Sequence, residues 1–143
     1  DNMVLTIEEE DRYVFVFDVD DPDSPTIGVF KEAYWGDTDV YVRGGMNGWG
    51  AVDRFSYQGD GIYTAELDLS AGNVEFKVAS EDWSTVNLGN PNDADSNVVT
   101  IGETKILGAS NNNLMLEVAE AGLYEFKVTG PDGNSPMLSV TKQ

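Results

Sequence analysis

Two tryptophans in this sequence lie where their indole rings could take part in binding. Trp49 and Trp83 lie among turn-forming and polar residues, outside any alternating apolar stretch. A ring at a turn is poorly placed for burial, and exposed aromatic rings often mark a binding surface. The apolar face of a sugar stacks on an indole while its hydroxyls bond to polar groups. We interpret these two rings as a stacking surface, with packing at the rim of the core as the alternative; for Trp35, packing is favoured.

Polar groups that could bond to sugar hydroxyls follow in the same part of the sequence. Lys77 lies on the polar face of a predicted strand, and the chain after that strand continues to Trp83. The consecutive amides of Asn111, Asn112 and Asn113 offer further donors and acceptors. Two indoles, one lysine and these amides would together make a shallow platform for a neutral sugar.

Composition argues against an enzyme. The 143 residues include no His and no Cys, which removes the commonest general base and all thiolate chemistry. A glycosidase-like pair of carboxylates remains conceivable among 26 acidic residues, but such pairs work in deep clefts of larger scaffolds. We therefore expect a non-catalytic protein. With a net charge of −18, nucleic acid and anionic membrane surfaces are poor partners.

Two acidic or amide-rich segments have the oxygen ligands that calcium prefers. The first segment runs from Asp18 to Asp23, and it lacks the glycine and the distal glutamate of an EF-hand loop. The second segment spans residues 90–97. Asp, Asn and Pro also build turns between strands, and this is the favoured explanation. We expect no cofactor and no metal; the alternative is calcium held by Asp18, Asp20, Asp21 and Asp23.

The elements that must position these side chains are short strands. Apolar and polar residues alternate over Tyr63–Leu69, Val74–Val78 and Tyr124–Val128, which is the pattern of half-buried strands. Turn residues separate them at Gly59–Gly61 and Pro131–Asn134. No stretch has a sustained apolar period of 3.6 residues. The pattern predicts an all-β fold, a β-sandwich.

The chain also repeats itself. Residues 1–31 match residues 112–142 without a gap. Apolar positions between the identities agree in class as well. The identical pairs are Asn2/Asn113, Leu5/Leu116, Glu9/Glu120, Tyr13/Tyr124, Phe15/Phe126, Asp21/Asp132, Ser24/Ser135, Pro25/Pro136, Val29/Val140 and Lys31/Lys142.

Two domain organisations account for this repeat. Residues 1–31 are either the tail of a preceding unit in a longer array or extra strands of the same sandwich, and residues 32–143 form the complete module. Val14 and Val16 stand where the second copy has Glu125 and Lys127, so the first copy's strand is apolar on both faces and is expected to be covered on both.

Composition also indicates where the protein works. No apolar run approaches the roughly 20 residues that span a bilayer, and the N-terminus has no basic-then-apolar signal pattern. We therefore expect a mature or excised soluble piece. A carboxylate-rich, lysine-poor surface suits salty surroundings, where charge repulsion is screened. The expected location is secreted or at the cell surface.

An ordered set of motifs resembles the family-48 carbohydrate-binding modules. The set begins with the strand and turn Asp39–Trp49 (DVYVRGGMNGW), continues through Tyr57–Tyr63 and Leu67–Lys77, and ends in the loop that carries Trp83. The resemblance covers about residues 40–128. That family includes accessory modules of bacterial pullulanases and amylases and the glycogen-binding domain of the AMP-activated kinase β subunit. It implies an immunoglobulin-like, early-set sandwich.

The resemblance also implies a ligand and a site. In the family, residues matching Trp49 and Trp83 stack on glucoses of an α-1,4 chain, while those matching Lys77 and either Asn112 or Asn113 bond to hydroxyls. The implied function is non-catalytic binding of starch, glycogen or maltooligosaccharide, anchoring a larger secreted amylolytic enzyme or glycan-capture protein. The alternatives are a structural spacer that binds no sugar, and a module for β-linked glucan or chitin. The segment 87–109, longer and more polar than in the kinase-type domain, departs from the family.

Overall fold

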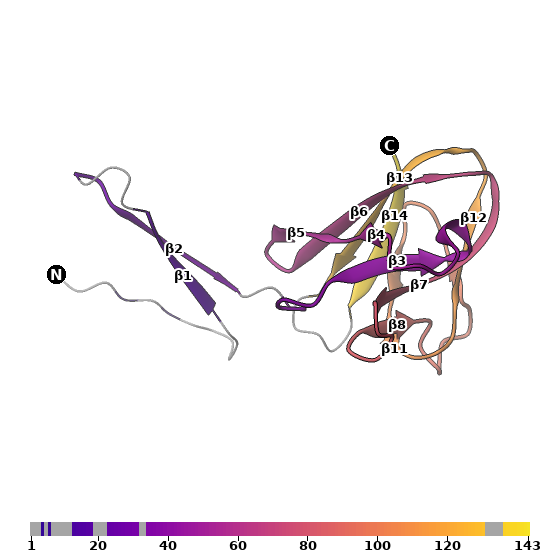
Figure 1. The fold of residues 1–143 in the computed structure, drawn as a ribbon, viewed down its shortest axis with the longest axis horizontal. Helices are drawn as coiled ribbons and strands as arrows, with labels where there is room; N and C mark the ends of the chain where they lie inside the picture. Colours follow the sequence, from indigo (N-terminus) through magenta and orange to yellow (C-terminus); the bar gives the residue numbers. More distant parts are fainter. Residues whose placement is uncertain (1–3, 5, 7–12, 19–22, 32–33, 131–135) are drawn as a thin grey trace. The chain divides into compact units, whose positions relative to one another are not determined.

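Alternating stretches of the sequence form strands in the computed structural model, which describes residues 4, 6, 13–18, 23–31, 34–130 and 136–143 (Figure 1). The chain divides into two compact units, Asp1–Glu32 and Ala33–Gln143. The first unit contains the antiparallel hairpin of β1 (Tyr13–Asp18) and β2 (Thr26–Lys31). Within the described part of the chain, the structure contains no helix with the length and apolar character that a bilayer span requires.

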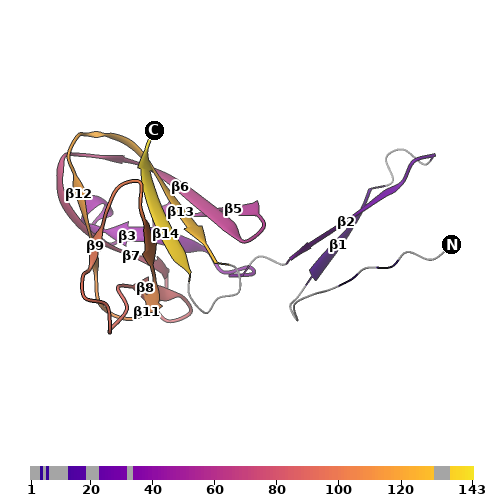
Figure 2. The ribbon, with the colours of Figure 1, turned by 180° about the vertical axis from the view of Figure 1, so that it is seen from behind.

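The second unit is built from two β-sheets (Figures 1 and 2). One sheet has the strand order β10-β14-β13-β6-β5. The bounds of its strands are β5 (Ser56–Gly59), β6 (Ile62–Leu69), β10 (Thr104–Ile106), β13 (Gly122–Thr129) and β14 (Met137–Lys142). All pairings in this sheet are antiparallel. We call it the β6–β13 sheet.

The other sheet is organised around the long strand β7, which pairs with β3, β8 and β12. Its pairings are antiparallel except for β9 with β12. We call it the β3–β7 sheet. Its elements are β3 (Val40–Gly44), the 3-10 turn η1 (Gly45–Asn47), β4 (Asp53–Arg54), β7 (Gly72–Ser80), β8 (Asn87–Gly89), β9 (Val98–Val99), β11 (Gly108–Ala109) and β12 (Leu114–Val118).

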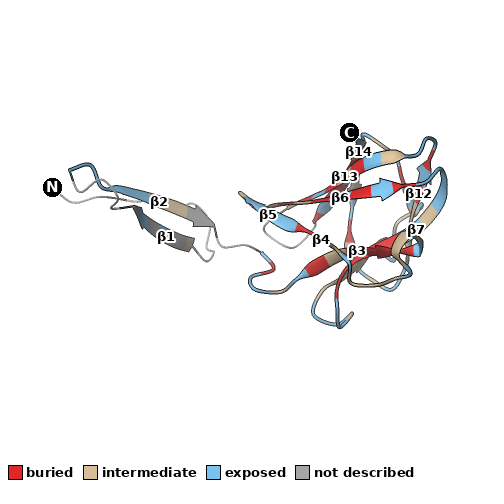
Figure 3. Ribbon diagram, turned by 45° about the horizontal axis from the view of Figure 1, so that its top comes forward, coloured by how far each residue is buried: buried red, intermediate tan, exposed pale blue. Residues whose placement is uncertain are grey.

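The core lies between the two sheets. Apolar residues at alternate positions of β3 and β6 are buried, as their periodicity predicts (Figure 3). Phe76 from the β3–β7 sheet meets Phe126 from the β6–β13 sheet edge-on, with ring centroids 5.4 Å apart. Trp35 also packs into the core against Tyr63 and Phe55, at centroid distances of 4.1 and 5.9 Å. The predicted all-β sandwich and the packing role of Trp35 are confirmed.

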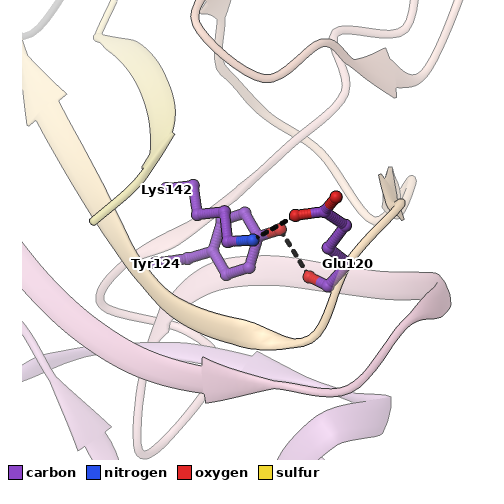
Figure 4. A network of polar contacts seen from close by, with 3 residues as sticks. All are labelled: Glu120, Tyr124 and Lys142. Atoms are coloured by element: carbon purple, nitrogen blue, oxygen red, sulfur yellow. Dashed lines mark hydrogen bonds and ion pairs between the residues drawn. The ribbon is translucent and has the colours of Figure 1, made fainter.

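A polar network anchors the start of β13 (Figure 4). The Tyr124 hydroxyl donates to the Glu120 carbonyl oxygen at 2.7 Å, which is the tyrosine corner found in immunoglobulin-like sandwiches. Lys142 Nζ donates to the Glu120 carboxylate at 2.5 Å, and this hydrogen bond lowers the pKa of Glu120 and raises that of Lys142. All three residues have an identical counterpart 111 positions earlier in the chain.

The N-terminal hairpin has the same strand register as the hairpin of β13 and β14. Phe15 lies opposite Val29 in the first, as Phe126 lies opposite Val140 in the second, 111 positions later. Phe15 is 51% exposed, whereas Phe126 is fully buried. The sequence repeat is therefore also a repeat of hairpin geometry. The two copies share a phenylalanine at this position, but only Phe126 of the second copy is buried.

Candidate functional site

Trp49 follows a turn that has little freedom to move. The turn leaves β3 at Gly44, where an added Cβ would lie 2.4 Å from the Glu75 carbonyl oxygen, so only glycine fits. The Asn47 side chain accepts a hydrogen bond from the Gly44 amide at 3.0 Å and donates to the Val42 carbonyl at 2.7 Å. These local bonds fix the backbone from which the half-buried Trp49 ring projects.

Trp83 sits in the loop between β7 and β8, which is held by one carboxylate. Asp82 accepts hydrogen bonds from the hydroxyls of Ser80, Ser84 and Thr85 at 2.5 to 2.8 Å. It also accepts from the backbone amides of residues 84 and 85 at 3.0 and 3.1 Å. Five bonds to one side chain make this exposed loop a defined support for the half-buried Trp83 ring.

Both tryptophans have a backbone conformation that a bulky residue rarely adopts. Trp49 has φ +63° and Trp83 has φ +59°, and among the described non-glycine residues only Asp60 also has a positive φ. Positive φ at such residues costs free energy and persists where the surroundings impose it. Strain of this kind gathers at functional sites. Its presence at both candidate residues is independent support for a shared binding role.

The structure brings the two rings together. Their centroids lie 6.2 Å apart, and the ring planes are inclined by 43°. Each side chain is half-buried, so part of each ring faces outward. Trp49 and Trp83, which we call the indole pair, thus form an angled aromatic surface from the turn after β3 and the loop after β7.

Arg43, which the sequence analysis did not select, supports both rings. Its guanidinium donates twice to the Trp49 carbonyl, at 2.7 and 2.9 Å. It also donates to the carbonyls of Ser80 and Glu81, at 2.8 and 2.9 Å. Its Cζ lies 3.7 Å from the centroid of the Trp83 ring, a cation–π contact. One side chain therefore holds the loop of each tryptophan and stacks on one of the two rings.

The charge of Arg43 is shielded from water. The side chain is 7% exposed, and burial lowers its pKa, an effect that the nearby charge of Glu81 partly offsets. A guanidinium stays protonated at neutral pH in either case. The only sequence signal for a role of Arg43 is its position at the end of a strand, directly before a glycine turn. The carbonyls that its guanidinium binds belong to loops that meet only after folding.

Lys77 lies one strand away from the indole pair and is covered. It is the cross-strand neighbour of Arg43, yet it is only 4% exposed. Its Nζ donates to the carbonyl oxygen of Ser110, and its stem lies against Gly89. Burial lowers the pKa of its ammonium group. The Lys77 side chain thus lies across Gly89 of the neighbouring strand β8 and ends on Ser110, after β11, whereas the sequence pattern alone places this lysine on a polar face.

The two asparagines predicted at the site lie beside Lys77 rather than on the indole pair. The Asn112 amide donates to the Asn92 side chain at 3.0 Å, and its backbone amide donates to the Ser110 hydroxyl at 3.2 Å. The Asn113 amide donates to the Glu75 carboxylate at 3.3 Å. The structure therefore brings Lys77 and Asn112 together through Ser110, and their predicted role in sugar binding stays a prediction.

The proposed calcium ligands are not gathered into a site that can be described. Among the residues that the structure describes, no group of three or more acidic side chains is placed to hold a metal ion. Asp20 and Asp21 lie outside the described residues, and the side chain of Asp18 does too, so Asp23 is the one candidate ligand whose side chain the structure describes.

The Asp82 carboxylate is expected to set the geometry of the Trp83 loop over a wide pH range. The hydrogen bonds from Ser80, then from Thr85 and Ser84, hold its pKa far below the usual value of 3.8. Because the pKa of Asp82 is lower in the folded state than in the unfolded state, its ionised carboxylate stabilises the loop at neutral pH. This contribution is lost only as the pH falls through the folded-state pKa. On the sugar-binding role that the sequence predicts for Trp83, the affinity of the wild type for sugar should therefore stay constant from pH 7 to about 4 in titrations.

The variant Asp82→Asn tests the same point. It keeps the size of the side chain but loses an acceptor oxygen and the charge, so the affinity for maltoheptaose that the sequence predicts should fall several-fold at pH 7. Because the side chain is exposed, the melting temperature should change little. Wild-type affinity in this variant would show that the five bonds do not position Trp83.

Comparisons with known proteins agree with the fold. No protein-family model matches the chain, and no curated protein matches it. A solved structure described as the ligand-induced structure of AmyP-SBD, a starch-binding domain, matches with a TM-score of 0.57 and 24% identity. The match covers 99% of this chain and 94% of that one. The comparisons give no specific support to family 48, and the chain is a two-sheet sandwich whose fold is similar to that of this solved structure.

Proposed function

We propose that this chain binds an α-1,4-linked glucan, such as starch, glycogen or maltooligosaccharide, without catalysing a reaction. Glucose rings stack on Trp49 and Trp83. The observation that carries the proposal is the indole pair itself: two half-buried rings, each on a strained and hydrogen-bonded turn, 6.2 Å apart. A site whose aromatic rings are held in place before the ligand arrives loses less conformational entropy on binding.

The angle between the rings favours an α-linked chain. Planes inclined by 43° match consecutive sugars of a curved chain, whereas a flat β-1,4 ribbon fits coplanar rings. The fold of a starch-binding domain and the motif order shared with family-48 modules support the same ligand. The predicted hydroxyl contacts from Lys77 and from Asn112 or Asn113 are kept in this proposal, although Lys77 is 4% exposed and its ammonium donates to Ser110, so the asparagine amides are the more accessible of these groups.

Isothermal titration of the full chain tests this function. Maltoheptaose and β-cyclodextrin should bind with micromolar to millimolar dissociation constants, about −4 to −8 kcal/mol. Cello-oligosaccharide should give no heat. Heat with the cello-oligosaccharide alone would point to a β-linked glucan. No heat with any sugar, on protein that circular dichroism shows to be folded, would make the chain a structural spacer.

We also propose that residues 1–31 are the closing hairpin of a preceding unit and that residues 32–143 are a complete module. The equal register of the two hairpins and the division of the chain into two compact units after Glu32 support this over the alternative of extra strands in one sandwich. Tandem modules would raise the effective affinity for a polysaccharide without new contacts. Such an array would anchor a secreted amylolytic enzyme or a cell-surface glycan-capture protein.

A further inference from the structure

A methionine lies in the turn that carries Trp49. Met46 is the middle residue of η1 (Gly45–Asn47), and Trp49 follows shortly after it. The side chain of Met46 is half-buried and packs against the hydrophobic core. A Cβ added at Gly44 would lie 2.9 Å from Met46 Sδ, so the sulfur lies directly against the backbone at which the turn leaves β3. The thioether is therefore part of the packing that holds this turn on the sandwich.

Gly44 connects this sulfur to the backbone of Trp49. Its carbonyl oxygen accepts a hydrogen bond from the Trp49 amide at 2.9 Å, and its own amide donates to the Asn47 side chain at 3.0 Å. Atoms of β7 lie 2.4 and 2.6 Å from the same added Cβ, so the sulfur has no room to move inward. A Met46 side chain that leaves this place therefore removes support from the residue to which the Trp49 backbone is bonded.

Met46 can be reached by a small molecule from outside. It lines a hollow of about 390 Å³, together with the end of β6, the start of β7 and the connection between these strands. A water molecule takes up about 30 Å³ in the liquid, and hydrogen peroxide has only one oxygen atom more, so the hollow admits it. Peroxide therefore reaches the half-buried Met46, although more slowly than it reaches the exposed Met137.

A peroxide oxidises a thioether by transferring one oxygen atom. A sulfur lone pair attacks one peroxide oxygen, the O–O bond breaks as the S–O bond forms, and the remainder of hydrogen peroxide leaves as water. The sulfur loses two electrons, and the peroxide gains them. The product, methionine sulfoxide, is polar and chiral, whereas the thioether is apolar. Because a polar group is costly against an apolar core, the sulfoxide of Met46 is expected to turn toward water and leave its place against Gly44.

We propose that Met46 is an oxidation site, and that its sulfoxide displaces the Trp49 turn and so lowers the affinity of the indole pair for sugar. The loss of sugar binding rests on the proposed function, whereas the oxidation and the movement of the turn do not. The change is reversible, because methionine sulfoxide reductases restore the thioether. In that step a dithiol supplies two electrons and the oxygen leaves as water.

Mild treatment of the full chain with hydrogen peroxide tests this inference. Mass spectrometry of its peptides measures the oxygen that Met46 gains, and calorimetry with maltoheptaose measures the affinity. The affinity of the oxidised chain should be several-fold lower, while circular dichroism shows that the sandwich is intact. Reduction by the two methionine sulfoxide reductases, with a dithiol as the electron donor, should restore the affinity.

Leucine variants assign the effect to one methionine. Leucine keeps the size and apolar character of methionine and is not oxidised, and each variant is compared with itself before and after treatment. Met46→Leu should keep its affinity after peroxide. Since this variant retains both indoles, it also tests whether tryptophan oxidation is the cause. Met115→Leu, half-buried on β12, and Met137→Leu, exposed on β14, should lose affinity as the wild type does.

Several outcomes would overturn the proposal. If Met46 stays unoxidised in the folded chain, peroxide does not reach its sulfur. An unchanged affinity after oxidation of Met46 would show that the turn does not depend on the thioether. An equal loss in Met46→Leu would place the cause elsewhere. Loss of the folded signal in circular dichroism would mean that oxidation unfolds the whole module.

The movement of the turn can also be measured without sugar. The indole N–H peak of Trp49 in a ¹H–¹⁵N spectrum, identified by its absence from Trp49→Ala, should shift as Met46 is oxidised. It should stay in place in peroxide-treated Met46→Leu. A wild type that binds no sugar, with a Trp49 peak that shifts on oxidation of Met46, would overturn only the proposed function. A peak that does not shift would overturn the inference about Met46 and leave the proposed function intact.

Discussion

Replacing Trp49 and Trp83 together by alanine lowers the affinity for maltoheptaose by at least about a hundredfold, on the proposed mechanism, while the sandwich stays folded. Aromatic stacking contributes about 0.5–1.5 kcal/mol per ring beyond the burial of apolar area. With that burial added, each ring accounts for about tenfold in affinity, since 1.4 kcal/mol corresponds to a factor of ten.

The fold should survive because neither ring belongs to the core. Both are half-buried on turns, and the buried core is made of other residues. Titration calorimetry measures the affinity, and circular dichroism with thermal melting measures the fold. Tyr57→Ala is the matched control, since it truncates an exposed aromatic ring of the β6–β13 sheet. An unchanged affinity in the double variant, or an equal loss in the control, would contradict the assignment of the indole pair.

The sequence predicts this surface because its signals are local. Turn residues around Trp49 and Trp83 indicate exposure before any fold is known, and period-two alternation in β6 and β13 indicates which face is buried. The burial of Lys77, by contrast, is not determined by its neighbours in the sequence. It depends on Gly89 and Ser110, which come from a segment that closes over β7 only in the folded chain.

Residues that act through backbone groups are the hardest to find in a sequence. Arg43 bonds to three carbonyl oxygens, and every residue type carries such an oxygen, so no partner can be recognised from its side chain. Trp35 was predicted to pack, which is correct, but the environment of its nitrogen, which has no partner among the described residues, depends on what surrounds the ring after folding. Sequence patterns therefore predict exposed aromatic rings and buried strand faces better than they predict the hydrogen bonds that hold these elements in place.

Arg43 is the second position where a single substitution should have a large effect. In Arg43→Met the carbonyls of Trp49, Ser80 and Glu81 lose their donor, and the Trp83 ring loses the cation beneath it. Each buried acceptor left without a partner costs about 1–3 kcal/mol. Because water can reach some of these loop carbonyls, we expect a loss of about 2–4 kcal/mol in the free energy of unfolding.

Affinity distinguishes a positioning role for Arg43 from a purely structural one. Measured by calorimetry at a temperature where the variant is fully folded, Arg43→Met should bind maltoheptaose about tenfold more weakly, because both rings lose their support. Arg43→Lys should recover stability in part but little of the affinity, since an ammonium reaches a carbonyl but lacks the planar fork that bonds several at once and stacks on a ring.

The other described arginine provides the control. Arg54 forms an exposed ion pair with Asp39 at 2.8 Å, and such pairs contribute about 1 kcal/mol or less. Arg54→Met should therefore change neither affinity nor stability by much. A folded Arg43→Met variant with wild-type affinity would mean that the two loops hold the indole pair without the guanidinium. A loss of affinity confined to Arg43 would mean that one buried cation couples the backbones of both loops to the angle at which their rings meet the sugar.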